Sequence, residues 1–279
     1  SNNATKEVLR YREALWKGFS TIKEKNKLEQ TTIIKVFQQI KNTRQGIRPP
    51  QSQVVIKRGQ SEIKPGKIIY TPPRGVDIVE KKIKNLIEFL NNHKKYPIDP
   101  LLKMVIAHYQ FEAIHPFTDG NGRTGRILNL LYLVQQKLLS HPVLFLSKYI
   151  LNNKDEYYAN LSGVTTRQAW KPWLNYMLAA IEITAQETNQ TIDEILSQME
   201  STHSFAKGKL KWYSLELNQL LFSQPYIKPK IIGELLNIKS RTTLTKYMHQ
   251  LTDIGIVSSH QEGKEIFYIN NDLIRILKS

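Results

Sequence analysis

Residues 115–126 read His-Pro-Phe-Thr-Asp-Gly-Asn-Gly-Arg-Thr-Gly-Arg, and a mostly apolar run, residues 127–134, follows them directly. The apolar run predicts a buried helix, and the glycines before it predict a tight turn that leads into the helix N-terminus. Backbone N–H groups at such a terminus have no partner within the helix, and the helix dipole favours an anion beside them. The stretch therefore predicts a phosphate site at this turn.

Four side chains in the same stretch supply chemistry for a phosphate. Arg123 and Arg126 are bidentate phosphate donors. Asp119 would repel a bare phosphate, so we expect it to hold a divalent cation, Mg²⁺, between the two. His115 precedes the turn, where a general base is useful. The pattern indicates phosphate chemistry with Mg²⁺ and a hydroxyl nucleophile.

The composition places limits on the class of protein. The chain has 279 residues, of which 41% are hydrophobic, enough for one large or two smaller domains. It has no apolar stretch of about 18 residues and no start like that of a secretory signal, so we expect no membrane span. The absence of cysteine excludes disulfides and thiolate metal sites. It fits a reducing compartment, and we expect a cytoplasmic protein.

The net charge of +16 is unevenly distributed along the chain. Residues 1–60 have a balance of +9, residues 61–205 of +2, and residues 206–279 of +5. The segment that contains the motif is therefore nearly neutral, and the excess lies toward the two ends. A basic surface attracts nucleic acid or acidic proteins, although a Lys-rich surface also serves solubility alone.

Upstream of the motif the periodicity is mostly helical. Residues 3–43 predict two helices with a polar break at 23–27, and residues 76–92 and 101–113 predict two more. Between these pairs, two short strands with a polar loop predict a β-hairpin, at residues 53–57 and 67–71. The fold class we expect is mainly α, a helical bundle with a hairpin flap at about 53–71.

Downstream, a change of pattern predicts a second domain. Residues 155–161 and 170–199 predict helices, and residues 200–210 are the expected boundary region. Beyond it, the pattern predicts three helices and then two strands, at 215–222, 230–236, 240–251, 256–259 and 265–269. This is the order of a winged helix-turn-helix. We therefore expect a first domain over 1–200 and a small α+β winged-helix domain over 211–279.

The motif resembles that of the Fic family of AMP-transferring enzymes, H-x-F-x-[D/E]-G-N-G-R-x-x-R, at every fixed position from His115 to Arg126. Residues 46–48 and 54–56, then 70–73, are similar to the family's flap hairpin, and residues 146–150 and 156–158 to its nucleotide-side segments. The resemblance covers roughly residues 3–200. It implies a Fic-type helical bundle and a protein adenylyltransferase.

The resemblance implies a role for each matching residue. His115 would take the proton from a Ser, Thr or Tyr hydroxyl of a target protein, which attacks the α-phosphate of ATP. Asp119 would bind Mg²⁺, and Phe117 would anchor the loop in the core. The residues expected at the nucleotide are Gly120, Asn121, Gly122, Arg123, Thr124, Gly125, Arg126, Tyr157 and Tyr158. Those expected to dock the target by strand addition are Val54, Val55, Ile56 and Lys57.

Many Fic proteins restrain themselves with an inhibitory helix, [S/T]-x-x-x-E-[G/N], whose glutamate pairs with the second motif arginine, here Arg126. Residues 20–25 come near this pattern but end in Lys, and residues 258–263 fit it in an expected turn. We therefore expect the inhibitory segment upstream of Ser1, lost by truncation.

Three alternatives to AMP transfer stay open. The chain can be a DNA-binding regulator with a Fic core, in which Lys239, Arg241 and Lys246 lie near the expected recognition helix. Winged helices also dock proteins. The same site can transfer another phosphate-containing group or remove AMP, although removal needs an acidic residue to activate water. A homodimer is a candidate assembly.

Overall fold

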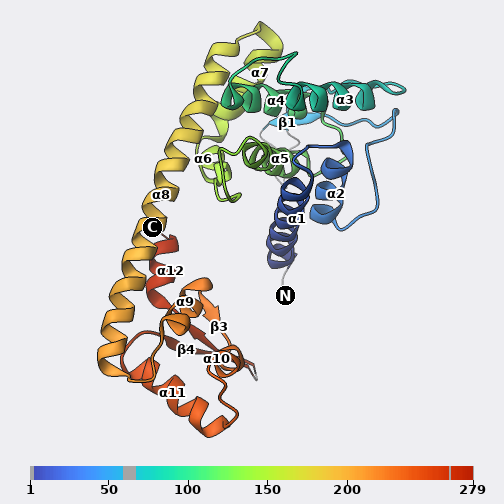
Figure 1. The fold of residues 1–279 in the computed structure, drawn as a ribbon. Helices are drawn as coiled ribbons and strands as arrows, with labels where there is room; N and C mark the ends of the chain where they lie inside the picture. Colours follow the sequence, from blue (N-terminus) through green and yellow to red (C-terminus); the bar gives the residue numbers. More distant parts are fainter. Residues whose placement is uncertain (1–2, 59–66, 264, 279) are drawn as a thin grey trace. The chain divides into compact units, whose positions relative to one another are not determined.

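A computed structural model describes residues 3–58, 67–263 and 265–278, which are mainly helical (Figure 1). The chain divides into two compact units, Ser1–Ala185 and Gln186–Ser279. Each unit has its own core of buried apolar side chains. The expected mainly α fold class is confirmed.

The predicted helices of the first unit are present, but the one after the motif begins six residues before the apolar run, because it includes Gly122 and Gly125. The helix predicted at 155–161 extends to Arg167, and a helix at 146–152 was not predicted. In chain order the helices are α1 (Asn3–Lys25), α2 (Gln30–Lys41), α3 (Ile78–Asn91), α4 (Pro100–Ile114), α5 (Asn121–Gln135), α6 (Leu146–Asn152), α7 (Lys154–Arg167) and the start of α8 (Trp170–Lys209). The polar break predicted between the first two helices falls at residues 26–29.

The centre of the first unit is α5, which packs against α1, α2 and α4 (Figure 1). Most of its side chains are buried on every face, as expected for a helix surrounded by others. Its partner α4 begins at a defined cap, since the Asp99 carboxylate accepts hydrogen bonds from the N–H groups of Leu101 and Leu102 and Pro100 follows it. Together α4 and α5 hold residues 115–120 between two fixed helix ends.

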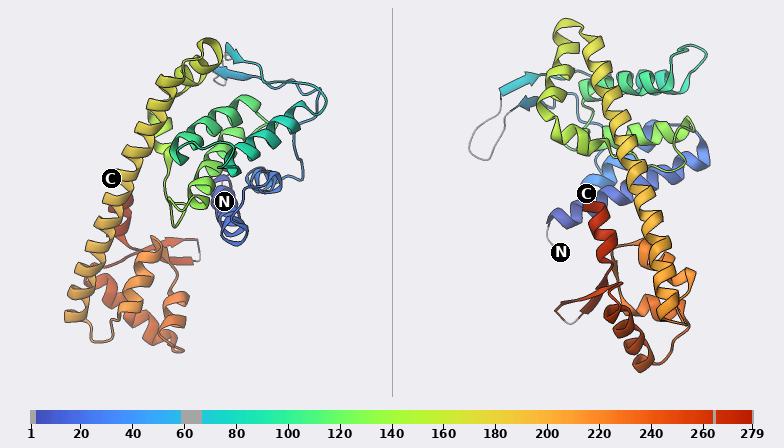
Figure 2. Two further views of the ribbon diagram at one scale, coloured as in Figure 1. Left: turned by 45° about the horizontal axis from the view of Figure 1, so that its top comes forward. Right: turned by 90° about the vertical axis from the view of Figure 1, so that its left-hand side faces the viewer.

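The predicted hairpin is present as β1 (Ile56–Arg58) and β2 (Lys67–Tyr70), an antiparallel pair. Its first strand starts three residues later than the sequence predicts, and a bulge falls between Ile56 and Lys57. Most of the predicted connecting loop, residues 59–66, lies outside the described residues. The left and right views of Figure 2 show both strands beside the helices of this unit.

The second unit begins within α8, which continues without a break to Lys209. The region 200–210, expected as a boundary, is therefore almost entirely helical, because a few polar residues do not break a helix. The elements that follow are α9 (Leu215–Ser223), β3 (Tyr226–Ile227), α10 (Pro229–Leu235), α11 (Arg241–Asp253), β4 (Ser258–Glu262), β5 (Glu265–Ile269) and α12 (Asn271–Lys278). The ranges 1–200 and 211–279 stay predictions for the two domains.

Two elements of the second unit lie outside the predicted pattern. Strand β3 is only two residues long and is defined by its pairing with β5, in a sheet of order β3-β5-β4. Helix α12 follows β5 directly, and the Asn270 side chain accepts a hydrogen bond from the Leu273 N–H at 3.0 Å. Neither feature has a periodic signal long enough to detect in the sequence.

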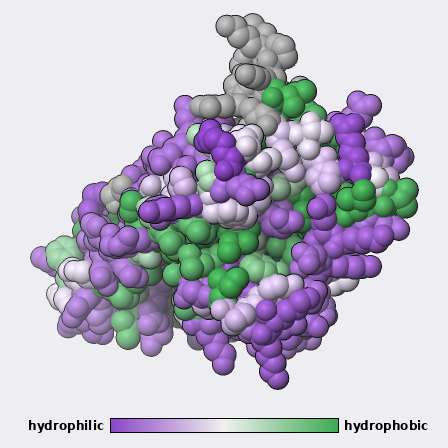
Figure 3. Space-filling model, turned by 90° about the horizontal axis from the view of Figure 1, so that it is seen from above, coloured by the Kyte–Doolittle hydropathy of each residue, from purple (hydrophilic) through white to green (hydrophobic). Residues whose placement is uncertain are grey.

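The surface drawn in Figure 3 is mostly hydrophilic, with apolar residues in groups between the polar ones. Among residues 3–58, 67–263 and 265–278, none of the helices combines the length and the apolar character needed to cross a bilayer.

Candidate active site

The turn after α4 is held by Arg48, a side chain only 3% exposed. His115 follows α4 in the left-handed region, with φ of 49°. The Arg48 Nε donates to the His115 carbonyl at 2.8 Å, and Nη2 donates to the carbonyls of Pro73 at 2.7 Å and Ile114 at 3.3 Å. Its backbone N–H donates to the Pro116 carbonyl at 2.9 Å. These bonds satisfy carbonyls that a helix end leaves unpaired, and they fix the main chain of His115.

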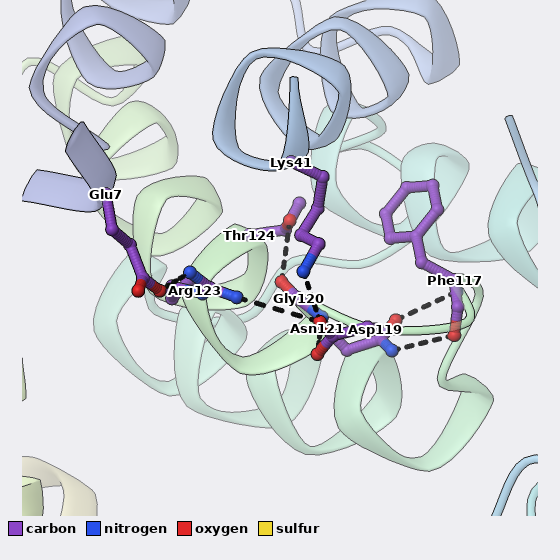
Figure 4. A network of polar contacts seen from close by, with 8 residues as sticks. All are labelled: Glu7, Lys41, Phe117, Asp119, Gly120, Asn121, Arg123 and Thr124. Atoms are coloured by element: carbon purple, nitrogen blue, oxygen red, sulfur yellow. Dashed lines mark hydrogen bonds and ion pairs between the residues drawn. The ribbon is translucent and has the colours of Figure 1, made fainter. Parts of the chain in front are cut away.

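The next residues are closed into a loop by Asn121. Its Nδ2 donates to the Phe117 carbonyl at 2.8 Å, and the Phe117 N–H donates to its Oδ1 at 2.9 Å (Figure 4). Phe117 is fully buried and stacks on Phe37 with a centroid distance of 3.9 Å, so its predicted role as an anchor in the core is confirmed. Both polar atoms of the Asn121 side chain are thus bonded within the loop. The backbone N–H of Asn121 is then the group that serves the predicted phosphate contact.

The ring of His115 is oriented by the main chain of α4. Its Nδ1 lies 3.2 Å from the Glu112 carbonyl oxygen. A carbonyl can only accept, so Nδ1 bears the proton and Nε2 keeps a lone pair. Burial lowers the pKa of His115, and Arg48 lowers it further, against opposite effects of the Glu112 carbonyl and Asp119. The imidazole is therefore neutral at pH 7, the form that accepts a proton.

The start of α5 presents the expected anion cradle. Gly120 is the N-cap with φ of 79°, and its carbonyl accepts from the Thr124 N–H at 3.0 Å and Oγ1 at 2.9 Å. The N–H groups of residues 121–123, in the first turn, therefore have no acceptor within the helix. Gly125 allows α4 to approach closely, because a Cβ there would lie 2.9 Å from Glu112 Oε1.

Four charged side chains, Glu7, Lys41, Asp119 and Arg123, surround this cradle, and we call them the rim (Figure 4). Lys41 donates a hydrogen bond to Asp119 Oδ2, and Arg123 forms an ion pair with Glu7. Arg123 Nη2 also lies 3.9 Å from Asp119 Oδ2, while the Gly120 N–H donates to Oδ1 at 2.6 Å. The Lys41 hydrogen bond is the main cause that lowers the pKa of Asp119.

The donor set at Asp119 fits a magnesium ion that is bound mainly by phosphates. Its side chain is 65% exposed, and the described residues contain no cluster of three or more acidic or histidine side chains that would hold a metal by itself. Mg²⁺ usually binds proteins through one or two carboxylates and completes its shell with waters and substrate phosphates. A single accessible carboxylate beside an anion cradle is consistent with that mode.

Beneath the turn lies a buried polar group of four residues, His108, Glu112, Asn129 and Tyr157, which we call the floor. Asn129 Nδ2 lies 3.1 Å from His108 Nδ1, and His108 Nε2 lies 3.0 Å from the Tyr157 hydroxyl. Donation by the amide to Nδ1 leaves the proton on Nε2. His108 is therefore a hydrogen-bonded residue of the core.

Burial shifts the pKa values of two floor residues, His108 and Glu112, in opposite directions. It lowers the pKa of His108 to about 3 and raises that of Glu112 to about 7. Nearby Arg126 lowers both values. Glu112 Oε1 has no hydrogen-bond partner among the described residues. An acid in such surroundings is protonated far more readily than one in water.

Arg126 lies between the floor and α1. Burial raises the pKa of Tyr11, on α1, and the nearby Arg126 cation opposes this rise. Both motif arginines therefore lie near side chains of α1, Arg123 in an ion pair with Glu7 and Arg126 near Tyr11. The resemblance implies that both arginines bind the nucleotide, so a nucleotide would compete with the Glu7 ion pair.

The two tyrosines expected at the nucleotide differ in their burial. Tyr157 is 6% exposed and belongs to the core and the floor, whereas Tyr158 is half-buried at its edge. Of the predicted docking residues, Ile56 and Lys57 lie in β1, and Val54 and Val55 precede it.

The remaining predicted contacts lie in the second unit. Lys239 precedes α11, Arg241 begins it and Lys246 lies within it, and all three side chains are exposed.

Four residues near the turn were missed as site residues by sequence reasoning: Glu7, Lys41, Arg48 and Glu112. Each is distant from the motif in sequence or, for Glu112, lies on an apolar helix face. A single Lys or Arg among the 40 of this chain gives no signal of its own. Of the four, only Glu112 gives a signal in the sequence, since a carboxylate within an apolar helical run predicts an unusual environment.

Two parts of the chain match known protein families. Residues 27–133 match the Fic/DOC family, and residues 198–273 match a family described as protein adenylyltransferase SoFic-like, C-terminal domain. Protein adenylyltransferase fic-1 of Caenorhabditis elegans is 33% identical over 114 residues, 41% of this chain and 21% of that protein. Probable protein adenylyltransferase aq_aa38 of Aquifex aeolicus (strain VF5) is 28% identical over 181 residues, 65% of this chain and 52% of that protein.

The chain thus spans about half or less of the length of these relatives. The crystal structure of a Fic family protein from Desulfovibrio desulfuricans G20 superposes with a TM-score of 0.54 at 17% identity, covering 95% of this chain and 76% of that chain. At this identity, the likeness concerns the fold alone. The chain carries a Fic/DOC family domain, with residues 115–126 inside the matched range, and a SoFic-like C-terminal domain after it.

Proposed function

We propose that this chain is a protein adenylyltransferase that moves AMP from ATP to a Ser, Thr or Tyr hydroxyl of a target protein. The observation that carries the proposal is the geometry of His115. Its Nδ1 proton is directed to the Glu112 carbonyl, so the lone pair of Nε2 is available beside the N-terminus of α5. The names of the relatives in the matched region support the same reaction class.

In the proposed reaction, the target hydroxyl oxygen attacks the α-phosphorus of ATP while His115 Nε2 takes its proton. The bond from the α-phosphorus to the bridging oxygen breaks, and pyrophosphate leaves with the electron pair. The N–H groups of residues 121–123 would stabilise charge on the α-phosphate oxygens, and Arg123 and Arg126 would bind the outer phosphates. Asp119 would hold Mg²⁺, which when bound neutralises phosphate charge.

The hairpin is the proposed docking element for the target. Strand β1 pairs on one side with β2, in a sheet of two strands. An extended target segment can add to its other edge by main-chain hydrogen bonds, which fix register with little demand on sequence. Ile56 and Tyr70 of the hairpin line a small cavity with Glu112 of α4, so the hairpin lies near the turn.

The decisive experiment is a transfer assay with labelled ATP and Mg²⁺, followed by mass spectrometry of the modified protein. An adduct of AMP mass would identify the transferred group. Removal of a general base lowers the rate by about 10²–10⁴-fold, so His115→Ala should lose nearly all transfer. The exposed His141 provides the control, since His141→Ala should retain activity. Transfer that survives His115→Ala would refute the proposed role of His115.

A second candidate function, DNA binding, rests on the second unit. The order α10, turn, α11 and β4-β5 is that expected of a winged helix-turn-helix, and Lys239, Arg241 and Lys246 are exposed around α11. Duplex DNA binding should weaken as salt rises, and replacing these three cations should reduce the salt dependence. Absence of binding at low salt would dismiss this candidate and favour a protein-docking role.

A further inference from the structure

Lys41 occupies an unusual place for a surface lysine. It is the last residue of α2, 78 positions from Asp119 in the sequence, and its ammonium bonds with that carboxylate. Its stem crosses Gly120, the N-cap of α5, where an added Cβ would lie 3.2 Å from Lys41 Cδ and 3.3 Å from Cγ. Only 33% of the Lys41 side chain is exposed. The lysine is therefore packed onto the motif itself (Figure 4).

Both oxygens of the Asp119 carboxylate have partners in this arrangement. Oδ1 accepts from the Gly120 N–H, and Oδ2 bonds with Lys41 and lies 3.9 Å from Arg123. A divalent cation that binds Oδ2 must approach the same atom as the Lys41 ammonium. Two cations at that distance repel each other, so the ammonium must leave when the metal arrives.

The displaced ammonium has a suitable anion within reach. Its stem already lies across Gly120, directly beside the N–H groups of residues 121–123 that form the anion cradle. A lysine is a compact cation on a flexible stem of four carbons, and it binds phosphate as a point charge without a fixed geometry. Once displaced, the ammonium would pair with a phosphate that is bound at this cradle.

We infer that Lys41 is a nucleotide-binding residue, whose ammonium pairs with Asp119 in the arrangement described here and with the polyphosphate once a divalent cation takes that carboxylate. The inference rests on the proposed function and adds to it a residue outside the motif. Lys41 thereby neutralises Asp119 until the metal arrives, and it then adds a third cation to those of Arg123 and Arg126.

The test compares Lys41→Met with Lys35→Met in the full chain. Methionine keeps an unbranched stem over Gly120 and removes the charge, and Lys35 is an exposed lysine of the same helix. Binding of α,β-methylene ATP, whose carbon bridge blocks transfer, is measured by calorimetry with Mg²⁺. We expect Lys41→Met to weaken binding about tenfold, the usual effect of one charged hydrogen bond, and Lys35→Met to leave it within about twofold.

A second measurement separates the two partners of Lys41. Mn²⁺ binding to the nucleotide-free protein, followed by electron paramagnetic resonance, should become about fivefold tighter in Lys41→Met, because the competing cation is gone. Lys41→Arg keeps a cation at this position and should retain most of the nucleotide affinity. That result would show that the loss in Lys41→Met comes from the missing charge and not from misfolding.

Analogue affinity that is equal in the wild type and Lys41→Met would overturn the inference while leaving the proposed function intact. Unchanged Mn²⁺ affinity would also overturn it, since no competition at Asp119 would then exist. A wild-type chain that binds no nucleotide would instead contradict the proposed function, and the inference with it.

Discussion

The rim and the floor are two sets of polar side chains near the same turn, and they differ in how far solvent reaches them. On the rim, each charge faces an opposite charge and remains partly exposed, with Asp119 65% exposed and the Arg123 side chain 23% exposed. In the floor, His108 is 1% and Glu112 6% exposed. Exposed ion pairs contribute about 0–1 kcal/mol, whereas a buried ionisable group without a partner changes its protonation instead.

This difference in exposure assigns ligand binding to the rim and the stability of the turn to the floor. Rim side chains can exchange partners at little cost, so they suit a ligand that arrives and leaves. Floor side chains have no solvent to replace a lost partner, so they fix the position of the turn. We therefore expect substitutions in the floor and in the loop to alter folding, and substitutions in the rim to alter nucleotide affinity.

Glu112→Gln provides the largest test of this contrast. The pKa of Glu112 is raised from 4.5 to about 7 by burial, with Arg126 acting in the opposite direction. The folded chain thus holds this proton more tightly than the unfolded chain. Its contribution to stability is complete below pH 4.5 and is lost as the pH rises through 7. Relative to Glu112→Gln, the wild type should lose about 3 kcal/mol of unfolding free energy over this window.

Urea unfolding at pH 4.5, 6 and 8, followed by circular dichroism, measures this difference. The contribution of His108, whose lowered pKa opposes folding as the pH falls from 6.5 toward 3, is common to both proteins and cancels. The exposed Glu80 supplies the control, since Glu80→Gln should show no such slope. A constant difference between Glu112→Gln and the wild type across the three pH values would mean that Glu112 ionises normally.

Sequence and structure agree best where the signal is local. The helical periodicity predicts α3 and α4 closely, and the turn before α5 falls at Gly120, whereas Gly122 and Gly125 lie inside α5 and not in the turn. The motif also predicts that His115, Asp119 and the two arginines gather at this turn. What the pattern cannot predict is which side chains meet across long sequence separations.

Lys41 and Asp119 are 78 residues apart, and Arg48 and His115 are 67 apart. Such pairs are created by the packing of α2 and the segment before β1 onto the turn, and no spacing rule encodes them. Asn121 illustrates a related limit. Its motif position predicts a phosphate contact, whereas its side chain is bonded twice to Phe117.

Asn121→Ala tests that structural role, with a somewhat smaller effect. It leaves the N–H and the carbonyl of Phe117 unpaired in a fully buried place, which should cost about 2 kcal/mol of unfolding free energy. Asn189, exposed on α8, gives the matched control, and Asn189→Ala should change stability by less than about 0.5 kcal/mol. Equal midpoints for both variants in urea would show that the loop does not depend on these bonds.

The smallest expected effect concerns the rim, at the ion pair between Glu7 and Arg123. Glu7→Gln removes the charge that holds Arg123 and leaves the length of the side chain unchanged. Because the pair is partly exposed, with Glu7 55% exposed, its strength is at most about 1 kcal/mol. Arg123 would then be available to a phosphate without first breaking an ion pair, so binding of α,β-methylene ATP should tighten by up to about fivefold.

Calorimetry of Glu7→Gln beside Glu24→Gln, an exposed glutamate of the same helix, separates this pair from a general change of charge on α1. Thermal stability of both variants should stay close to that of the wild type, as expected for exposed ion pairs. If Glu7→Gln weakens nucleotide binding, Glu7 orients Arg123 for the phosphate and does not compete with it. If Glu7→Gln lowers stability as much as a change in the floor, the distinction between the two sets is wrong. Higher affinity with unchanged stability is the result that the rim geometry predicts.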